Sequence, residues 1–446
     1  MPVDYDLAIV GGTLAGRWAA LHAAQMGARV VLAEPPSPQP RLASETLPLG
    51  QGAALAEGVM GHGSVVLSVS ALAVNGVDVV LESPVFEAMQ PVRLRVGDRH
   101  LSARRGLLAM AGAVRRYDLP AVMACQPCTP ADFSATAWPQ RVALVGAQAA
   151  TVEWATALIQ RGIAVTLVPP GQRILPAEDI DIQRLVTAQL RALGVRWGMP
   201  THGVLADGQI GLKAAADDRP ISVERVVLTD SSPPDLAGLN LPGLATSGPL
   251  SVNAYLQTQY SDLYAIGAVL GGEDRLALAR AEAEIATENA LFWHRRVLRY
   301  DRLHYSLRAL TPIGRAGLTE QQARRYCNEV AVYQSGAAGQ LRSAPVMLDA
   351  AADCAMDFCK LVVADGLLVG VHLMGESAEV AIALLAPYLG QSPDRLVNAR
   401  VNGLEDSNGL AGQIDGALAQ YRDRRWRPGT WRRDWAENWF NWRRSR

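Results

Sequence analysis

Residues 5–34 constrain the fold of this chain most, because they contain the pattern strand, glycine turn, helix, strand. Leu7–Val10 and Arg29–Ala33 are short apolar runs typical of buried parallel strands. Gly11 begins a tight turn after the first run, Gly16 lets the next helix pack closely, and Arg17–Met26 has the composition of that helix. The order predicts a βαβ unit of an α/β fold.

The turn of this unit has the features of a dinucleotide site. The frame Gly-x-Gly-x-x-Gly is filled by Gly11, Thr13 and Gly16, so the glycine that normally lets backbone approach a pyrophosphate is replaced. Glu34 follows Gly11 by 23 residues, where a carboxylate binds a ribose hydroxyl. We expect a nucleotide to be bound by Gly11, Gly12, Thr13, Ala15, Gly16 and Glu34. The alternative is an ordinary βαβ unit with a glycine-rich turn.

A second unit of the same kind begins at Arg141. Its frame is filled by Gly146, Gln148 and Thr151, and Gln148 puts a long side chain where the pyrophosphate would lie. The second strand runs into Val168-Pro169-Pro170, which supplies neither an acid for NAD nor an arginine for NADP. Productive NAD(P)H binding here is therefore doubtful.

The remaining patterns predict further elements. Strands are expected over 64–82, 91–110, 209–213 and 222–228, helices over Gln51–Val59, Ile180–Leu193 and Leu276–Trp293, and a hairpin over 358–373 with an Asp365-Gly366 turn. Thr319 and Gln322 form a predicted capping box. Alanines at 279, 283, 286 and 290 give the long helix a face of small residues.

Length and composition exclude several classes of protein. A chain of 446 residues is too long for one core, and its net charge of −1 argues against a general nucleic-acid surface. No apolar stretch is long enough to span a bilayer, and five cysteines do not make a disulfide framework. We expect a soluble, cytoplasmic protein that does not bind nucleic acid.

The order of these segments resembles the pyridine nucleotide-disulphide oxidoreductases, the flavoproteins that include dihydrolipoamide dehydrogenase, glutathione reductase and mercuric reductase. The resemblance runs from about residue 4 to 400. It rests on segments 9–16, Gly112, 145–153, 173–176, 263–267, 317–320, 358–362 and 370–375.

The resemblance implies two Rossmann-like domains and a C-terminal α+β dimerisation domain. Residues 1–138 and 250–302 would form the FAD-binding domain, 139–249 an NAD(P)-binding-like domain, and 303–405 the domain of a homodimer, followed by a tail over 406–446. It also implies that Gly112, Gly267 and Ala268 lie at FAD, and that Glu153 lies near a nicotinamide. Ala268 replaces an aspartate that holds the ribityl chain, so one charge-assisted hydrogen bond of about 1.5–3 kcal/mol is lost.

The family's redox groups are missing. Its Cys-x4-Cys disulphide would match Arg41 and Thr46, with Gly50 in place of the lysine, and the chain has no cysteine before Cys125. The family's histidine base would fall in Arg400–Glu405, but no histidine follows His372, so the latter is interpreted as structural.

Cys125-Gln-Pro-Cys128 is a candidate replacement. The spacing is that of a redox motif, and low-molecular-weight thioredoxin reductases carry a Cys-x-x-Cys at a comparable place. A plain interdomain linker and a metal site are the alternatives, although no second Cys or His pair has zinc spacing. We name Cys125 and Cys128 as weak catalytic candidates and predict no metal.

Residues 421–446 form a basic, tryptophan-rich tail. They hold nine arginines and three acidic residues, a net charge of +6, and Trp431, Trp435, Trp439 and Trp442 share one face of a helix. Such a helix docks on an anionic membrane surface, on a partner protein, or back on its own dimer.

Three hypotheses of function follow. The first is an FAD-dependent oxidoreductase that works without the usual disulphide and takes electrons from NAD(P)H or a carrier protein. The second is a catalytically degenerate dimeric scaffold that acts through its tail, and the third is a thiol oxidoreductase using Cys125 and Cys128.

Overall fold

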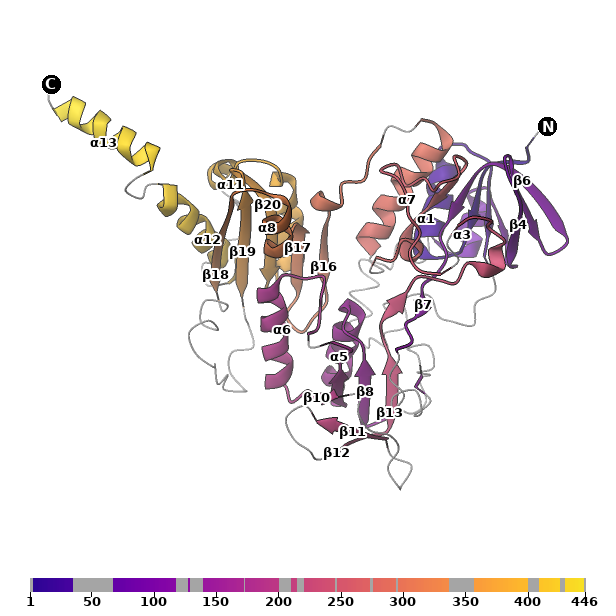
Figure 1. The fold of residues 1–446 in the computed structure, drawn as a ribbon, viewed down its shortest axis with the longest axis horizontal. Coiled ribbons are helices and arrows are strands. Elements are labelled where there is room, and N and C mark those ends of the chain that lie inside the picture. The colour runs from indigo at the N-terminus through magenta and orange to yellow at the C-terminus, as the bar shows by residue number, and fades with distance from the viewer. Residues whose placement is uncertain are drawn as a thin grey trace. The chain divides into compact units, whose positions relative to one another are not determined.

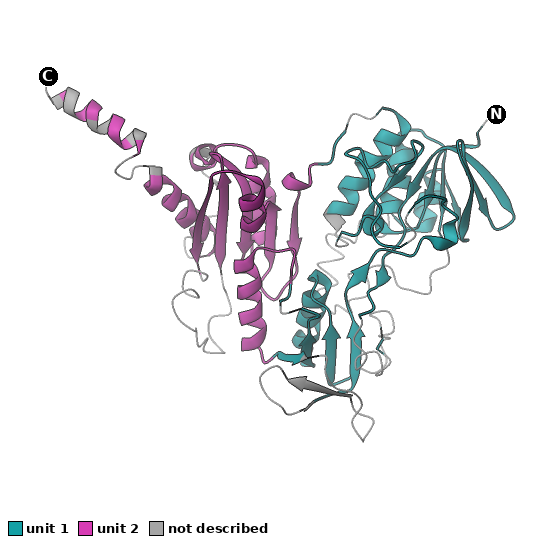
Figure 2. Ribbon diagram, viewed as in Figure 1, with its two compact units in different colours: residues 1–174, 195–298 teal, residues 175–194, 299–446 magenta. Residues whose placement is uncertain are grey.

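The computed structural model describes the chain in thirteen segments that form two compact units. The segments are 3–34, 67–117, 127–128, 139–171, 173–199, 210–214, 220–244, 247–272, 276–293, 296–336, 357–399, 409–425 and 430–444. Unit 1 is Met1–Ile174 and Val195–Leu298, and unit 2 is Leu175–Gly194 and Arg299–Arg446 (Figure 2). Predictions for Gln51–Val59, 41–50, Cys125 and 400–405 lie outside the described residues and stay predictions.

The first sheet of unit 1 is organised around one long strand. The order is β3-β2-β1-β6-β5-β4, with β15 also paired to β6. The second half of β6 pairs in parallel with β1 and β15, and its first half pairs antiparallel with β5. The bounds are β1 Tyr5–Val10, β2 Val30–Ala33, β3 Val77–Val80, β4 Pro84–Met89, β5 Val92–Val96, β6 Arg99–Leu108 and β15 Leu263–Ala265. The predicted βαβ unit is thus present, with its turn at the carboxyl end of β1.

Two helices rich in small residues pack together beside this sheet. They are α1 (Leu14–Gln25) and α7 (Leu276–Leu291), which lie side by side in Figure 1. The packed alanines are Ala19, Ala20 and Ala23 on α1 and Ala279, Ala283, Ala286 and Ala290 on α7, all buried. The predicted small-residue face is therefore confirmed as a buried face of α7.

One predicted strand was wrong in part. Within 64–82 the structure has the helix α3 (Val69–Val74) before β3. The Ser68 hydroxyl caps this helix by accepting a hydrogen bond of 3.1 Å from the Ala71 amide. The Val-Ser-Ala-Leu-Ala-Val run alternates as a strand does, but only Leu72 of the helix is buried.

The second sheet of unit 1 contains the second βαβ unit. Its order is β12-β11-β10-β9-β8-β13, and β8, β9, β10 and β13 pair in parallel. The strand predicted over 222–228 is interrupted at Glu224, so that it forms the end of β12 and all of β13. The bounds are β8 Arg141–Val145, α5 Ala149–Gln160, β9 Ala164–Val168, β10 Arg196–Met199, β11 Ile210–Ala214, β12 Pro220–Val223 and β13 Arg225–Leu228.

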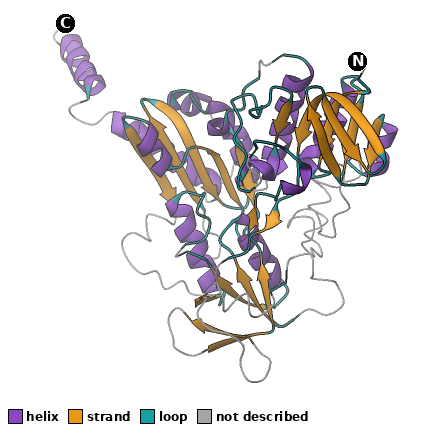
Figure 3. Cartoon of the chain, turned by 45° about the vertical axis from the view of Figure 1, so that its right-hand side comes forward, coloured by secondary structure: helices purple, strands orange, loops and turns teal. Residues whose placement is uncertain are grey.

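Unit 2 is an antiparallel sheet with helices (Figure 3). The strand order is β16-β17-β20-β19-β18, and the Asp365-Gly366 turn of the β19–β20 hairpin has positive φ at both residues, as predicted. The bounds are α6 Ile180–Ala192, β16 His304–Leu307, β17 Ile313–Gly317, α8 Glu320–Tyr326, β18 Val330–Gly336, β19 Phe358–Ala364, β20 Leu367–Met374, α10 Ala378–Leu385 and α11 Pro393–Ala399.

Two helices lie in the predicted tail. The helix α12 (Leu410–Arg425) buries Leu410, Ile414 and Leu418 in the core of the unit 2 sheet. The helix α13 (Trp431–Arg444) confirms the predicted tryptophan helix, and its Trp435 and Trp439 rings stack with centroids 5.9 Å apart. In the described part of the chain, no helix has the length and apolar character required to cross a membrane.

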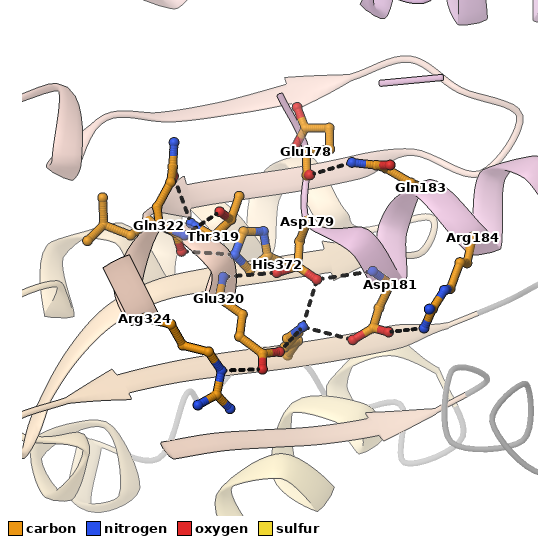
Figure 4. Close-up of polar contacts among 12 residues, drawn as sticks. Glu178, Asp179, Asp181, Gln183, Arg184, Thr319, Glu320, Gln322, Arg324 and His372 are labelled. Carbon is orange, nitrogen blue, oxygen red and sulfur yellow. Dashed lines mark hydrogen bonds and ion pairs between the residues drawn. The ribbon is translucent and has the colours of Figure 1, made fainter. Parts of the chain in front are cut away.

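A buried lysine ties three elements of unit 2 together. The Lys360 ammonium on β19 lies 2.7 Å from the Asp179 carboxylate, 2.8 Å from Asp181 and 2.7 Å from Glu320, and the three carboxylates converge in Figure 4. Burial alone would lower the pKa of Lys360, but these carboxylates, led by Asp179, raise it. The adjacent capping box of Thr319 and Gln322 is present as predicted. This cluster is structural, since it joins β19 to α6 and α8.

Candidate functional site

The first glycine turn is built by close packing of backbone on backbone. Gly11 has φ +116°, and a Cβ added there would lie 2.3 Å from the Ala109 carbonyl oxygen at the end of β6. A Cβ on Gly16 would lie 2.1 Å from the Gly11 carbonyl oxygen. The predicted conformational roles of these two glycines are confirmed: one permits the turn and the other the close approach of α1.

Thr13, the departure from the glycine frame, serves as the N-cap of α1. Its hydroxyl donates to the Ala109 carbonyl at 2.7 Å and accepts from the Gly16 amide at 3.2 Å. The next two amides, of Leu14 and Ala15, have no acceptor within the described parts of the chain. Such amides, together with the helix dipole, form an anion site.

Glu34 is held beside the turn by an arginine that the sequence did not single out. The Arg17 guanidinium donates to both Glu34 carboxylate oxygens, at 3.1 and 2.9 Å, and the two side chains are only 11% and 5% exposed. Arg17 also donates to the Leu67 carbonyl at 2.9 Å. The sequence held a signal for this pair. Arg17 is a charged residue among the small apolar residues at the start of the helix, and Glu34 is an acid at the end of the next strand.

The absence of a side chain at Gly12 leaves room for the Glu34 carboxylate. A Cβ at position 12 would lie 2.1 Å from the carboxyl carbon and from one oxygen of Glu34. The carboxylate therefore rests directly against the turn, where a ribose next to a bound pyrophosphate would reach it.

The segment that follows β15 lies close to α1. Gly267 has φ +72°, and a Cβ there would be 3.6 Å from the Ala15 side chain. The Gly267 amide donates to the carboxylate of Glu282 on α7 at 2.6 Å, and Glu282 is 2% exposed. A Cβ on Gly112 would lie 3.2 Å from Ala268. The structure thus gathers Ala15, Gly112, Gly267 and Ala268 near the first turn, and it adds Glu282, which the sequence analysis missed.

The second glycine turn contains a carboxylate from elsewhere in the chain. Asp230, two residues after β13, accepts from the Ala147 amide at 3.0 and 2.9 Å, the Gln148 amide at 2.9 Å and the Thr151 hydroxyl at 2.9 Å. The Tyr117 hydroxyl also donates to Asp230. A Cβ on Gly146 would lie 2.4 Å from an Asp230 oxygen.

Gln148 lies along the same edge. Its side-chain oxygen accepts from the Ser231 amide at 3.1 Å, and its side-chain nitrogen donates to the Ser231 carbonyl at 3.4 Å. Gln148 is the N-cap residue of α5, but its side chain makes no capping bond. Glu153, the proposed nicotinamide neighbour, lies on the first turn and a half of α5 and is half-buried.

The cysteines make no redox pair in the described residues. The Cys128 backbone pairs with β13, and its thiol lies 3.3 Å from the Val226 carbonyl oxygen. Cys359 is buried in β19, and burial raises the pKa of its thiol. In the same described segments, no group of three or more His, Cys, Asp or Glu side chains is arranged to hold a metal.

Comparison with known proteins now assigns these two turns to a family. A family model described as "Pyridine nucleotide-disulphide oxidoreductase" matches residues 5–284, which contain both turns. The chain belongs to this family. Its members are FAD-dependent flavoproteins, and NAD(P)H is their usual substrate. The resemblance noted in the sequence is thus confirmed.

Similar proteins carry names from the same family. A dihydrolipoyl dehydrogenase of Bacillus subtilis is 29% identical over 34% of each chain, and a glutathione reductase of a Nostoc species is 25% identical over 64% of this chain and 65% of its own. This chain thus covers less than two thirds of these relatives' length.

Two solved structures share the fold. LpdA of Mycobacterium tuberculosis has a TM-score of 0.73 and 18% identity, with 93% of this chain and 99% of that chain covered. The HOCl-induced flavoprotein disulfide reductase RclA of Escherichia coli, solved as a Cu(II) complex, has a TM-score of 0.69 and 19% identity over 94% and 100%.

Proposed function

We propose that the chain is an FAD-dependent oxidoreductase that holds its flavin nucleotide at the first turn and works without the family's Cys-x4-Cys disulphide. The observation that carries the proposal is the start of α1. There, the amides of Leu14 and Ala15 have no acceptor in the described segments, and Glu34 lies against Gly12.

The residues at this turn fit an adenine dinucleotide. Leu14 and Ala15 would donate their amides to the pyrophosphate, and Glu34 would accept from a ribose hydroxyl while Arg17 fixes its position. Gly11 and Gly16 keep the turn tight. FAD bound there would supply the electron transfer.

The electron acceptor is proposed to meet the flavin without a thiol relay. The positions that match the family's two cysteines are Arg41 and Thr46, and no cysteine precedes Cys125. Cys128 is engaged with β13, which supports its role as part of a linker. We also propose a homodimer, on the grounds of family membership, and mass measurement in solution tests it.

Flavin content tests the proposal directly. We expect FAD to be released from the purified protein on denaturation, and the bound flavin to be bleached by a chemical reductant under anaerobic conditions. A colourless protein that cannot be reconstituted with FAD would contradict the proposal.

A matched pair of variants at Thr13 tests the place of binding. Aspartate and asparagine both cap helices well, so Thr13→Asp and Thr13→Asn preserve the start of α1. Only aspartate adds a negative charge at the anion site, and two charges about 4 Å apart repel by about 4 kcal/mol at an effective dielectric constant near 20. We expect FAD affinity to fall at least tenfold in Thr13→Asp and to change little in Thr13→Asn. Equal affinity in both variants would place the flavin elsewhere.

A second candidate function is binding to an anionic membrane surface through α13. Trp435, Trp439 and Phe440 are 59%, 44% and 51% exposed, and residues 421–446 carry a net charge of +6. Tryptophan rings and arginines together favour the headgroup region of anionic bilayers. Co-sedimentation with phosphatidylserine vesicles tests this. It should be lost in Trp435→Ala/Trp439→Ala, and equal binding by both proteins would contradict it.

A further inference from the structure

The two glycine turns of this chain differ in what lies at their helix starts. At the first turn the amides of Gly12 and Thr13 have no acceptor within the described segments, whereas at the matching positions of the second turn the amides of Ala147 and Gln148 both donate to Asp230. In a dinucleotide-binding unit these amides are the donors to the pyrophosphate.

We propose that Asp230 occupies the anion position of the second unit and that this unit is therefore closed to NAD(P)H. This inference rests on the geometry of α5 and stands apart from the flavin proposal.

The carboxylate of Asp230 is fully engaged. Its hydrogen bonds come from the Ala147 and Gln148 amides, the Thr151 hydroxyl and the Tyr117 hydroxyl. A carboxylate offers about four lone-pair sites, so these four donors saturate it. Asp230 is also buried, with 3% of its surface exposed. A nucleotide could replace it only by breaking these bonds together, and hydrogen bonds to a charged group are stronger than those between neutral groups.

Charge opposes the nucleotide as well. A pyrophosphate brought to α5 would meet a carboxylate, and like charges in contact repel more strongly near a protein surface than in water. The same helix dipole that would attract the phosphate already stabilises Asp230.

Neighbouring residues hold Asp230 in place. Ser231 and Ser232 form β14, which pairs with Ala113 and Val114 of β7, and the Arg115 amide donates to the Asp230 carbonyl at 2.8 Å. Burial, followed by the hydrogen bond to Asp230, raises the pKa of Tyr117, so its hydroxyl stays a donor. Gln148 is fastened across to Ser231. The carboxylate is thus fixed by strand pairing and not by its own side chain alone.

The ribose end of the second unit also lacks a partner. After β9 the chain continues as Val168-Pro169-Pro170, whose side chains offer neither a carboxylate for a ribose hydroxyl nor an arginine for a 2′-phosphate. Both recognition elements of a pyridine nucleotide are therefore replaced.

The test is a binding titration of the purified full-length protein with NADH, NADPH and ADP-ribose, followed by calorimetry. For the wild-type protein we expect no saturable binding up to about 1 mM, a Kd worth about 4.1 kcal/mol. Saturable binding of NADH or NADPH by the wild type, in competition with ADP-ribose, would overturn the inference. That result would leave the flavin proposal intact, because flavin content is measured separately.

Three variants test whether Asp230 is the residue that closes the second turn to NADH. Asp230→Ala removes the carboxylate and frees the two amides, so NADH affinity should rise at least tenfold over the wild type. Asp98→Ala removes an exposed carboxylate from the turn between β5 and β6 of the first sheet and should leave NADH affinity unchanged. Asp230→Asn keeps the size of the side chain, so it should gain less than Asp230→Ala.

A folded Asp230→Ala protein without gain in NADH affinity would show that Asp230 is not what closes the turn. Thermal melting establishes that the variant is folded. If it is not, hydrogen exchange of the wild type decides. Amide protection over residues 146–151 should be unchanged by NADH, and increased protection would contradict the inference.

Discussion

Arg17 and Glu34 form a buried ion pair beside the first turn, and breaking such a pair is costly. Arg17→Met leaves the Glu34 carboxylate buried without its two hydrogen bonds, so we expect the free energy of unfolding to fall by about 3–5 kcal/mol. The double variant Arg17→Met/Glu34→Gln removes both charges and should recover part of this loss. Urea unfolding measures both values, and a double variant less stable than Arg17→Met would contradict the role of the pair.

His372 makes the protein sensitive to acid. Burial is the main cause that lowers its pKa to about 4 from an ordinary value of 6.5, so the folded protein keeps this ring neutral. Between these pH values only the unfolded chain binds the proton. The free energy of unfolding should therefore fall, as pH falls, by about 1.4 kcal/mol per pH unit.

The Asp179 carboxyl extends this acid sensitivity to lower pH. Burial opposes its ionisation, but His372 and Lys360 hold its pKa at about 2, below the ordinary 3.8. Its contribution is present above pH 3.8 and is lost as pH falls toward 2. Urea midpoints across pH 3–8 measure both effects. The His372→Gln variant should lose the upper step and, because His372 also lowers the Asp179 pKa, should show a smaller lower step. A wild-type profile that is flat from pH 6.5 to 4 would be inconsistent with the neutral buried ring.

Single residues were predictable where their partners are near in sequence. Thr319 and Gln322 stand three apart, and Gly11, Gly16 and Glu34 belong to one βαβ pattern. Asp230 was not predictable, because 82 residues separate it from the Gln148 amide that it binds. The sequence predicted that Gln148 obstructs the second turn, and it did not indicate the carboxylate beside it.

Lys360 links three elements of unit 2, so its effect belongs to the scale of elements. Lys360→Met would leave three carboxylates, from α6 and α8, without their shared cation. We expect unit 2 to lose about 3–5 kcal/mol of stability, as for other broken buried pairs. Arg184→Met is the matched control, because it removes an exposed partner of Asp181 at 3.7 Å. The free energy of unfolding of Arg184→Met should fall by no more than about 1 kcal/mol. Chemical unfolding compares the two, and equal losses would contradict a structural role for Lys360.

The helix α12 closes the unit 2 core, although the sequence analysis assigned residues 406–446 to a tail. Because Leu410, Ile414 and Leu418 are buried, truncation after residue 405 should expose the sheet and abolish cooperative unfolding. Truncation after residue 425 removes α13 and leaves α12, so cooperative unfolding should persist. Thermal melts of the two truncated proteins test this, and a stable protein ending at 405 would show that α12 is dispensable.

The predicted helices and strands match the structure where the sequence pattern and the packing agree, as in the β19–β20 hairpin and α7. The prediction of strands over 64–82 was wrong in part, because a run of alternating small and apolar residues is compatible with both a strand and a short helix. There the Ser68 cap and the packing of Leu72 favour a helix. A serine at the start of a helix can be recognised in the sequence, whereas the packing of Leu72 is visible only in the structure.

At the scale of the whole molecule, the chain keeps the architecture of its family, and we propose that it changes the chemistry that the family usually carries. The family match spans both turns, and LpdA and RclA share the fold over more than nine tenths of this chain. At the first turn the amides that begin α1 have no acceptor within the described segments, while at the second turn Asp230 accepts from the Ala147 and Gln148 amides. The resemblance matches Arg41 and Thr46 to the family's cysteines.

The absorption spectrum of the purified full-length protein tests the central claim most directly. A protein that holds FAD at the first turn shows an oxidised flavin spectrum in near-stoichiometric amount. The Thr13→Asp variant loses that spectrum, whereas the Thr13→Asn variant keeps it. A wild-type protein without flavin absorbance, even after incubation with FAD, would contradict the account.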